Sequence, residues 1–160
     1  MKKHKRTVLV GKAASGKDHF RKVLENKGFK YAVSYTTRPP RTGEVEGKDY
    51  FFLEKEEFEK MIENGEFYEH VTFNGWYYGT TREQFFNEDI FIMTPHGISK
   101  IQSEDRENTF IIYLDMPYEE REKRLMLRSD ADTVERRLVA DEKDFENFTT
   151  FDVRITNTDF

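Results

Sequence analysis

The order of the expected secondary-structure elements predicts an α/β fold in which a parallel sheet carries helices on both faces. Short apolar runs, which are typical of buried strands, lie at residues 7–10, 90–93 and 109–114. Each run is followed by a helical pattern, and strands that alternate with helices favour parallel pairing. A strand-rich block from about residue 36 to residue 80 breaks this alternation, so we also expect a small antiparallel insertion.

The first part of the chain is expected to form a strand, a loop, a helix and a second strand. These elements are placed at residues 7–10, 11–16, 17–26 and 31–35. Gly28 suits the C-terminal cap of the helix. A long loop follows over residues 36–48, because this stretch contains four residues that interrupt regular structure: Pro39, Pro40, Gly43 and Gly47.

The expected insertion continues with a strand, a helix and a hairpin. Its strand is placed at 49–53, its helix at 56–64, and the arms of its hairpin at 66–73 and 76–78. The helix has apolar residues on one face and Gly65 just past its end. The hairpin is predicted because Asn74-Gly75 is a strong signal for a two-residue turn.

The second half of the chain returns to alternating strands and helices. Helices are expected to start near Gly97 and near Pro117. Pro117 supports the second start, because proline suits the first position of a helix. A further helix at 134–148 and a last strand at 152–155 complete the pattern. No internal repeat, low-complexity tract or linker divides the sequence, so we expect one domain over residues 1–160.

The composition favours a folded domain and counts against several classes of protein. The chain has 160 residues, of which 15% are aromatic, and a domain of this length buries about 70% of its unfolded surface. Its net charge of −5 argues against a general nucleic-acid binder. No apolar run approaches the roughly 20 residues of a membrane helix, and no cysteine is present. We expect a cytoplasmic protein that binds neither nucleic acid nor membrane.

A phosphate-binding loop is predicted at the end of the first strand. The sequence Gly11-Lys12-Ala13-Ala14-Ser15-Gly16-Lys17 matches the pattern G-x-x-x-x-G-K between an expected strand and an expected helix. Backbone N–H groups of such a loop, together with the helix N-terminus, bind phosphate oxygens. Lys17 is placed to contact the β- and γ-phosphates of ATP, which is therefore the expected phosphate donor.

Asp18 departs from this motif, which normally has Ser or Thr after the lysine as a magnesium ligand. A carboxylate can also hold magnesium, so Asp18 is a candidate ligand for Mg²⁺. The alternative is that Asp18 only caps its helix, because aspartate is favoured near helix starts.

A second candidate site lies in the long loop. The run Ser34-Tyr35-Thr36-Thr37-Arg38-Pro39-Pro40-Arg41 places two arginines three residues apart in a segment stiffened by two prolines. Arginine side chains form paired hydrogen bonds with phosphate, so the loop is able to hold a phosphate dianion. By itself, this pattern is equally consistent with a polar surface loop.

Residues 33–50 resemble the loop with which the guanylate kinase family binds the phosphate of GMP. The resemblance continues through residues 56–69, Tyr77-Tyr78-Gly79-Thr80 and residues 121–140, and it ends near Asn157. It implies a P-loop NTPase-type core at 1–33 and 81–160, a monophosphate-binding insertion at about 34–80 and a lid at about 121–140. The implied activity is transfer of the ATP γ-phosphate to GMP, dGMP or a related nucleoside monophosphate.

The resemblance also implies roles for individual residues. Those expected to contact the acceptor monophosphate are Ser34, Arg38, Arg41, Tyr50, Glu69, Tyr78, Gly79, Thr80 and Thr94. Glu69 suits guanine, because a carboxylate accepts hydrogen bonds from the N1–H and N2–H edge of that base. Asn157 would lie against the adenine of ATP. The residues expected to act in catalysis are Lys17, Arg38, Arg124, Arg128 and Arg137.

Several features distinguish the chain from the usual members of this family. Ile92 and Thr94 stand where the family has two aspartates, one near the metal and one near the guanine amino group. The sequence also ends where members usually continue into a final helix, so we expect a shortened, divergent member. Open alternatives are a kinase for another deoxynucleoside monophosphate or for a ribose bisphosphate, and a non-catalytic binding module. Either a monomer or a homodimer is expected.

Overall fold

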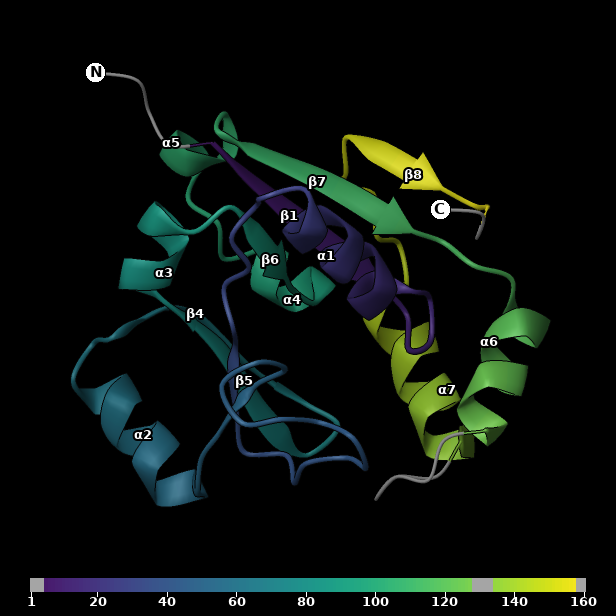
Figure 1. The fold of residues 1–160 in the computed structure, drawn as a ribbon, viewed down its shortest axis with the longest axis horizontal. Coiled ribbons are helices and arrows are strands. Elements are labelled where there is room, and N and C mark those ends of the chain that lie inside the picture. Colours follow the sequence, from purple (N-terminus) through teal and green to yellow (C-terminus); the bar gives the residue numbers. More distant parts are fainter. Residues whose placement is uncertain (1–4, 128–133, 158–160) are drawn as a thin grey trace.

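A four-stranded parallel sheet forms the centre of the computed structural model, which describes residues 5–127 and 134–157. The strand order is β6-β1-β7-β8. The strands are β1 (Arg6–Gly11), β6 (Ile90–Ile92), β7 (Thr109–Leu114) and β8 (Val153–Ile155). β1 pairs with both β6 and β7, so the strand that precedes the phosphate-binding loop lies inside the sheet (Figure 1).

Helices cover both faces of this sheet, as predicted. Side chains alternate along a strand, so Leu9 faces one side of the sheet while Val8 and Val10 face the other. The Leu9 side packs against α1 (Lys17–Asn26) through Phe20 and Leu24. On the Val8 side, Phe85 and Ile98 belong to α3 (Arg82–Asn87) and α4 (Pro95–Ile98). The α/β class predicted from alternating strands and helices is therefore confirmed.

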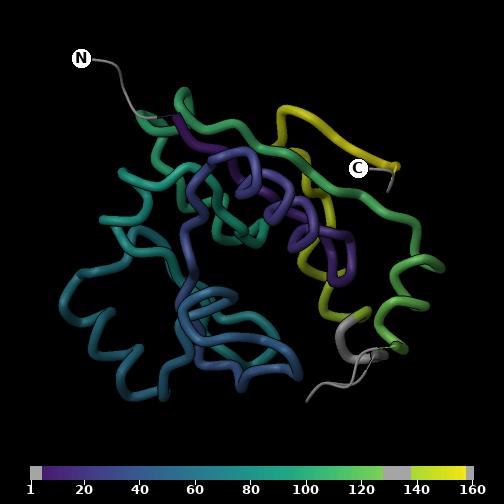
Figure 2. The backbone as a smooth tube through the Cα atoms, in the orientation of Figure 1, coloured from purple at the N-terminus to yellow at the C-terminus, as the bar shows by residue number. Residues whose placement is uncertain are grey.

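A second sheet is built from residues 35–81 and lies beside the first (Figures 1 and 2). Its strand order is β3-β2-β5-β4. The strands are β2 (Tyr35–Thr36), β3 (Phe51–Phe52), β4 (Phe67–Phe73) and β5 (Trp76–Thr81). The β4–β5 hairpin turns at Asn74 and Gly75, where φ is 55° and 88°, as the Asn-Gly pair predicted. The pairing is not wholly antiparallel, because β2 and β3 run parallel.

The α2 helix (Lys55–Glu63) covers the second sheet through one buried aromatic ring. The ring of Phe58 stacks on Phe67 at a centroid distance of 4.5 Å and on Tyr77 at 4.9 Å. Aromatic pairs at such distances add to the free energy gained by burying their surface. The apolar face expected for residues 56–64 therefore attaches the helix to the hairpin.

Three further helices complete the fold: α5 (Ser103–Arg106), α6 (Tyr118–Met126) and α7 (Val134–Asp144). α6 and α7 lie side by side beyond the carboxyl ends of β1 and β7 (Figure 1). Between them Arg121, which is 2% exposed, lies 3.6 Å from Asp141. This buried ion pair holds the two helices together next to the phosphate-binding loop.

The expected strand at 31–35 is wrong as a continuous element. Tyr31 forms a bridge with Ile90 of the first sheet, whereas Tyr35 pairs with Gly79 of the second. The segment passes from one sheet to the other, so its backbone hydrogen bonds are divided between them. Its apolar residues indicated burial, but they could not show that the strand is interrupted.

The helices also differ from the predictions in three places. α3 was not predicted, although Thr81 and Gln84 form a capping box that marks its start. α5 was not predicted either, because four residues are too short to show a helical period. α7 ends at Asp144 rather than residue 148, since Phe145 and Phe148 turn onto Tyr113, each at a centroid distance of 5.4 Å.

Candidate active site

One cavity of about 870 Å³ lies where the phosphate-binding loop, the second sheet and α7 meet. Most of the predicted site residues line it, including residues that are more than 50 positions apart in the sequence. On the loop side these are Gly11, Ala13, Ala14, Ser15, Gly16, Lys17, Asp18 and Arg124. On the opposite side they are Ser34, Arg38, Arg41, Tyr50, Glu69, Tyr78, Gly79 and Thr94.

Of the predicted residues whose side chains the structure describes, three do not line the cavity. Lys12 points to Glu142 of α7, with its Nζ 3.0 Å from Oε1. Thr80 is buried behind Glu69, and Asn157 follows β8 as an exposed residue. Arg128 lies outside the described residues, and so does the side chain of Arg137.

The phosphate-binding loop has the geometry that its motif predicted. It connects β1 to α1 with two residues at positive φ, Ala14 at 60° and Gly16 at 96°. Gly16 is the N-cap of α1, and without a side chain it leaves the first N–H groups of the helix open to an anion. Lys17 Nζ donates to the carbonyls of Gly11 and Lys12 across the loop. The side chain of Lys17 therefore folds back across the phosphate-binding loop.

Side chains from α6 and α7 form hydrogen bonds with the backbone of this loop. Arg124 Nη1 donates to the carbonyl of Ala14 at 2.9 Å. The backbone N–H of Ala13 donates to Asp141 Oδ2 at 2.8 Å. Of the three arginines expected on the lid, Arg124 is thus placed at the loop by its own hydrogen bond.

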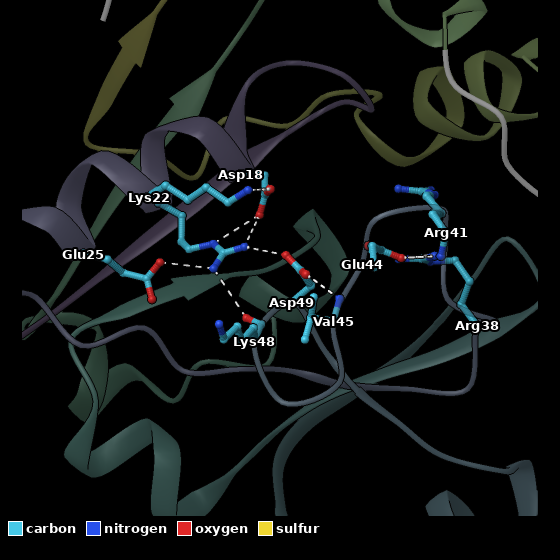
Figure 3. Close-up of polar contacts among 10 residues, drawn as sticks. Asp18, Lys22, Glu25, Arg38, Arg41, Glu44, Val45, Lys48 and Asp49 are labelled. Atoms are coloured by element: carbon cyan, nitrogen blue, oxygen red, sulfur yellow. Dashed lines mark hydrogen bonds and ion pairs between the residues drawn. The ribbon is translucent and has the colours of Figure 1, made fainter.

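In the acceptor loop, defined here as residues 36–50, one glutamate forms hydrogen bonds with both arginines. Arg38 is 3% exposed, and its two Nη atoms lie 2.9 and 3.0 Å from the carboxylate oxygens of Glu44. Glu44 also accepts the backbone N–H of Arg41 at 2.7 Å (Figure 3). The ring of Tyr50 lies 5.1 Å from Arg38 Cζ. The loop is therefore folded by its own charged groups, with Arg38 and Arg41 at the cavity.

Glu69 is a buried carboxyl group at the far side of the cavity. It is 5% exposed, and Thr80 donates to it through its hydroxyl and backbone N–H groups. Burial raises the pKa of Glu69 to about 7, although the bonds from Thr80 and the charge of Lys100 oppose this. A Cβ atom at Gly97 would lie 2.8 Å from Glu69 Oε2, so the carboxyl lies against the start of α4.

This burial predicts that Glu69 makes the stability of the unliganded protein depend on pH. The folded protein favours the protonated carboxyl, whose ordinary pKa is 4.5, so its contribution to unfolding free energy falls as pH rises from about 4.5 to about 7. The loss amounts to about 3 kcal/mol. Urea unfolding of Glu69→Gln and wild type at pH 4.5 and pH 8 should show the variant gaining relative stability at the higher pH. The exposed Glu66→Gln variant is the matched control, and parallel pH curves for Glu69→Gln and wild type would contradict the prediction.

Thr94 occupies the N-cap of α4 and uses its side chain there. Its Oγ1 accepts the backbone N–H of Gly97 at 3.0 Å. Ile92 lines the same cavity, so no carboxylate enters it from the end of β6. The hydroxyl of Thr94 remains able to contact a ligand beside Glu69, but it brings no charge.

Asp18 is an exposed residue at the cavity and is paired with two cations. Arg21 donates to its Oδ1, and Lys22 Nζ lies 3.3 Å from its Oδ2. Burial alone would raise the pKa of Asp18, but the bonds and charges of Arg21 and Lys22 outweigh it and lower the pKa. Among the described residues, no group of three or more His, Cys, Asp or Glu side chains is arranged to hold a metal ion.

Sequence reasoning missed several charged residues at the cavity: Glu44, Asp141 and Asp144 line it, and Arg21 binds Asp18, which also lines it. Asp144 lines the cavity from α7, and in the described part of the chain its buried Oδ2 accepts no hydrogen bond. Burial and the nearby Asp141 raise its pKa, while the charges of His96 and Lys17 oppose this. Of these residues, only Glu44 stood in a suggestive local context, because it lies between glycines in the loop that carries the two arginines.

No helix in residues 5–127 or 134–157 has the length and apolar character needed to cross a membrane. This result agrees with the absence of long apolar runs in the sequence.

Comparisons with known proteins converge on one family. A family model described as guanylate kinase matches residues 3–160. The guanylate kinase of a Nostoc species is 34% identical over 163 residues, covering 96% of this chain and 82% of the relative. The guanylate kinase of Bacillus cereus is 35% identical over 161 residues, covering 94% and 78%. The crystal structure of guanylate kinase from Anaplasma phagocytophilum superimposes with a TM-score of 0.74 at 27% identity, covering 99% of this chain and 80% of that one. The chain belongs to the guanylate kinase family.

Proposed function

We propose that this protein transfers the γ-phosphate of ATP to GMP or dGMP. The observation that carries the proposal is a single cavity with a phosphate-binding loop at one end and a buried carboxylate at the other. Arg38 and Arg41 line the same cavity, and we assign to them the phosphate of the acceptor nucleotide, which would meet the γ-phosphate of ATP there. Phosphoryl transfer depends mainly on such positioning and on neutralising charge.

The donor side is assigned to the loop, Lys17 and Arg124. When ATP binds, Lys17 Nζ would exchange the carbonyls of Gly11 and Lys12 for phosphate oxygens. The open N–H groups at the start of α1 would take further phosphate oxygens. Arg124 already reaches the loop at Ala14, so a small movement of its side chain would bring it to the transferred group. We assign Arg128 and Arg137 to the same lid by resemblance, and Asn157 to the adenine.

The acceptor side is assigned to the second sheet and the acceptor loop. Arg38 and Arg41, aided by the hydroxyls of Tyr50 and Tyr78, would hold the dianionic phosphate of GMP. Ser34, Glu69 and Thr94 would contact the base, with Thr80 holding Glu69 in place. Recognition of guanine by Glu69 requires the charged carboxylate, because both N1–H and N2–H are donors.

Magnesium would be held by Asp18, directly or through a bound water. The residues present fit this ion, because magnesium keeps several waters and needs only one or two protein carboxylates. Asp18 lies next to Lys17 and lines the cavity. Arg21 holds its Oδ1, so Oδ2, which lies 3.3 Å from Lys22 Nζ, would be the oxygen offered to the ion. Bound there, the ion would neutralise charge on the phosphates.

The proposed function is tested by measuring ADP release with each common ribo- and deoxynucleoside monophosphate. We expect the highest kcat/KM with GMP or dGMP, and measurable turnover with at least one non-guanine monophosphate. The second expectation follows from Thr94, whose neutral hydroxyl makes hydrogen bonds roughly half as strong as those of a carboxylate. No activity with GMP or dGMP would overturn the proposed function. A preference for these two acceptors above about 10⁴-fold over every other base, a level that matched polar recognition can reach, would contradict the looser selectivity.

A further inference from the structure

Arg21 is a buried cation on the helix that follows the phosphate-binding loop. It lies one turn after Asp18 and is 3% exposed. Its Nε donates to Asp18 Oδ1 at 3.1 Å, and its Nη2 donates to the same oxygen. Its Nη1 donates to Glu25 Oε2 at 3.1 Å (Figure 3). These contacts by themselves join Arg21 only to other residues of α1.

The same guanidinium group also binds the acceptor loop. Its Nη2 donates to Asp49 Oδ1 at 3.1 Å, and its Nη1 donates to the carbonyl of Lys48 at 3.4 Å. The ring of Tyr31 covers its face at 4.4 Å. A guanidinium group has five N–H donors in one plane, and the five hydrogen bonds to these acceptors use all of them. A lysine has the charge but not this fork, so it cannot make the same set of contacts.

Asp49 transmits this restraint to the groups that hold the acceptor phosphate. Its second oxygen, Oδ2, accepts the backbone N–H of Val45 at 2.8 Å, which closes the turn between these two residues. Glu44, which precedes Val45, holds Arg38 by two hydrogen bonds. Tyr50, which follows Asp49, places its ring beside the same arginine. Both ends of the turn that Asp49 fixes are therefore attached to Arg38.

Arg21 does not line the cavity, although Asp18 and Asp49 do. We propose that Arg21 is a positioning residue that links the two substrate sites: it sets the acceptor loop, through Asp49, against the helix of the phosphate-binding loop. It thereby contributes to GMP binding without touching GMP, because a loop that is ordered in advance loses less conformational freedom when the ligand binds. This inference rests on the proposed function, since it concerns the same acceptor.

The experiment measures binding of GMP and of ATP separately, by calorimetry, to the wild type, Arg21→Lys, Asp49→Asn and the double variant. In each single variant we expect the Kd for GMP to rise about tenfold, while the Kd for ATP changes less than threefold. Arg21→Lys keeps the charge that neutralises Asp18 and removes only the fork. If Arg21 acts through Asp49, the double variant will lose no more GMP affinity than the weaker-binding single variant.

Glu25→Gln is the matched control, because it changes an Arg21 partner on α1 that does not belong to the acceptor loop. Its Kd for GMP should stay within twofold of the wild type. A fall in Tm with an unchanged Kd for GMP in Arg21→Lys and Asp49→Asn would overturn the inference and leave Arg21 a structural residue. An equal loss of ATP and GMP affinity would also overturn it. If the wild type itself fails to bind GMP, the proposed function fails first. If Arg21→Lys does not fold, Asp49→Asn decides the question, because it leaves Arg21 bound to Asp18 and Glu25.

Discussion

Replacing Lys17 by alanine should lower kcat for GMP phosphorylation by about 10²- to 10³-fold, the range seen when one donor to a transition state is removed. In the structure Lys17 Nζ donates to the backbone carbonyls of Gly11 and Lys12. Gly11 lines the cavity, where water can replace the lysine. In the variant, the negative charge of the transferred phosphoryl group, in contrast, would no longer be neutralised by the ammonium group of Lys17.

The measurement is steady-state ADP release with saturating GMP, together with the Tm of each variant. Lys27→Ala, at the other end of α1, is the matched control, since its exposed side chain is far from the cavity. We expect the control to retain wild-type kcat and both variants to keep the wild-type Tm within a few degrees. A Lys17→Ala variant that phosphorylates GMP as fast as the wild type would show that the kinase assignment is wrong.

Features whose cause lies within a short stretch of sequence could be predicted. The phosphate-binding loop requires a strand, two glycines and a lysine in a run of about a dozen residues, and all of these are local. The hairpin was equally clear, because Asn74 and Gly75 adopt positive φ in a turn that few other residues accept. The burial of both faces of the parallel sheet could be predicted from the apolar runs, since a strand buried on both sides has no alternation of polar and apolar residues.

Contacts between distant segments could not be predicted from patterns of this kind. Asp141 reaches the N–H of Ala13 across 128 positions, and Asp49 meets Arg21 across 28. In the sequence, both aspartates are ordinary charged residues among many others. Their roles depend on the tertiary fold, which brings α7 over the loop and the acceptor loop against α1. The same reason explains why Asp18 could be singled out but its pairing with Arg21 could not.

Replacing Arg41 by methionine should raise the KM for GMP by roughly 10- to 100-fold and the KM for ATP by less than threefold. A hydrogen bond to a charged group contributes about 1.5–3 kcal/mol, and the phosphate of GMP would lose the contacts of one arginine. Arg41 is a cleaner choice than Arg38, whose removal would leave Glu44 in the loop without its two guanidinium bonds. The backbone N–H of Arg41, which Glu44 accepts, survives the substitution.

The two KM values are measured by varying one substrate while the other is saturating, with Arg82→Met as the matched control because this exposed arginine lies at the start of α3. If Arg41 binds the acceptor phosphate, the loss appears in the KM for GMP and in kcat/KM for GMP, while the same quantities for ATP stay near the wild type. Equal increases in both KM values would place Arg41 between the substrates or on the donor side. In that case the acceptor loop would not be the phosphate site, and Arg38, which shares Glu44 with Arg41, would have to be reassigned with it.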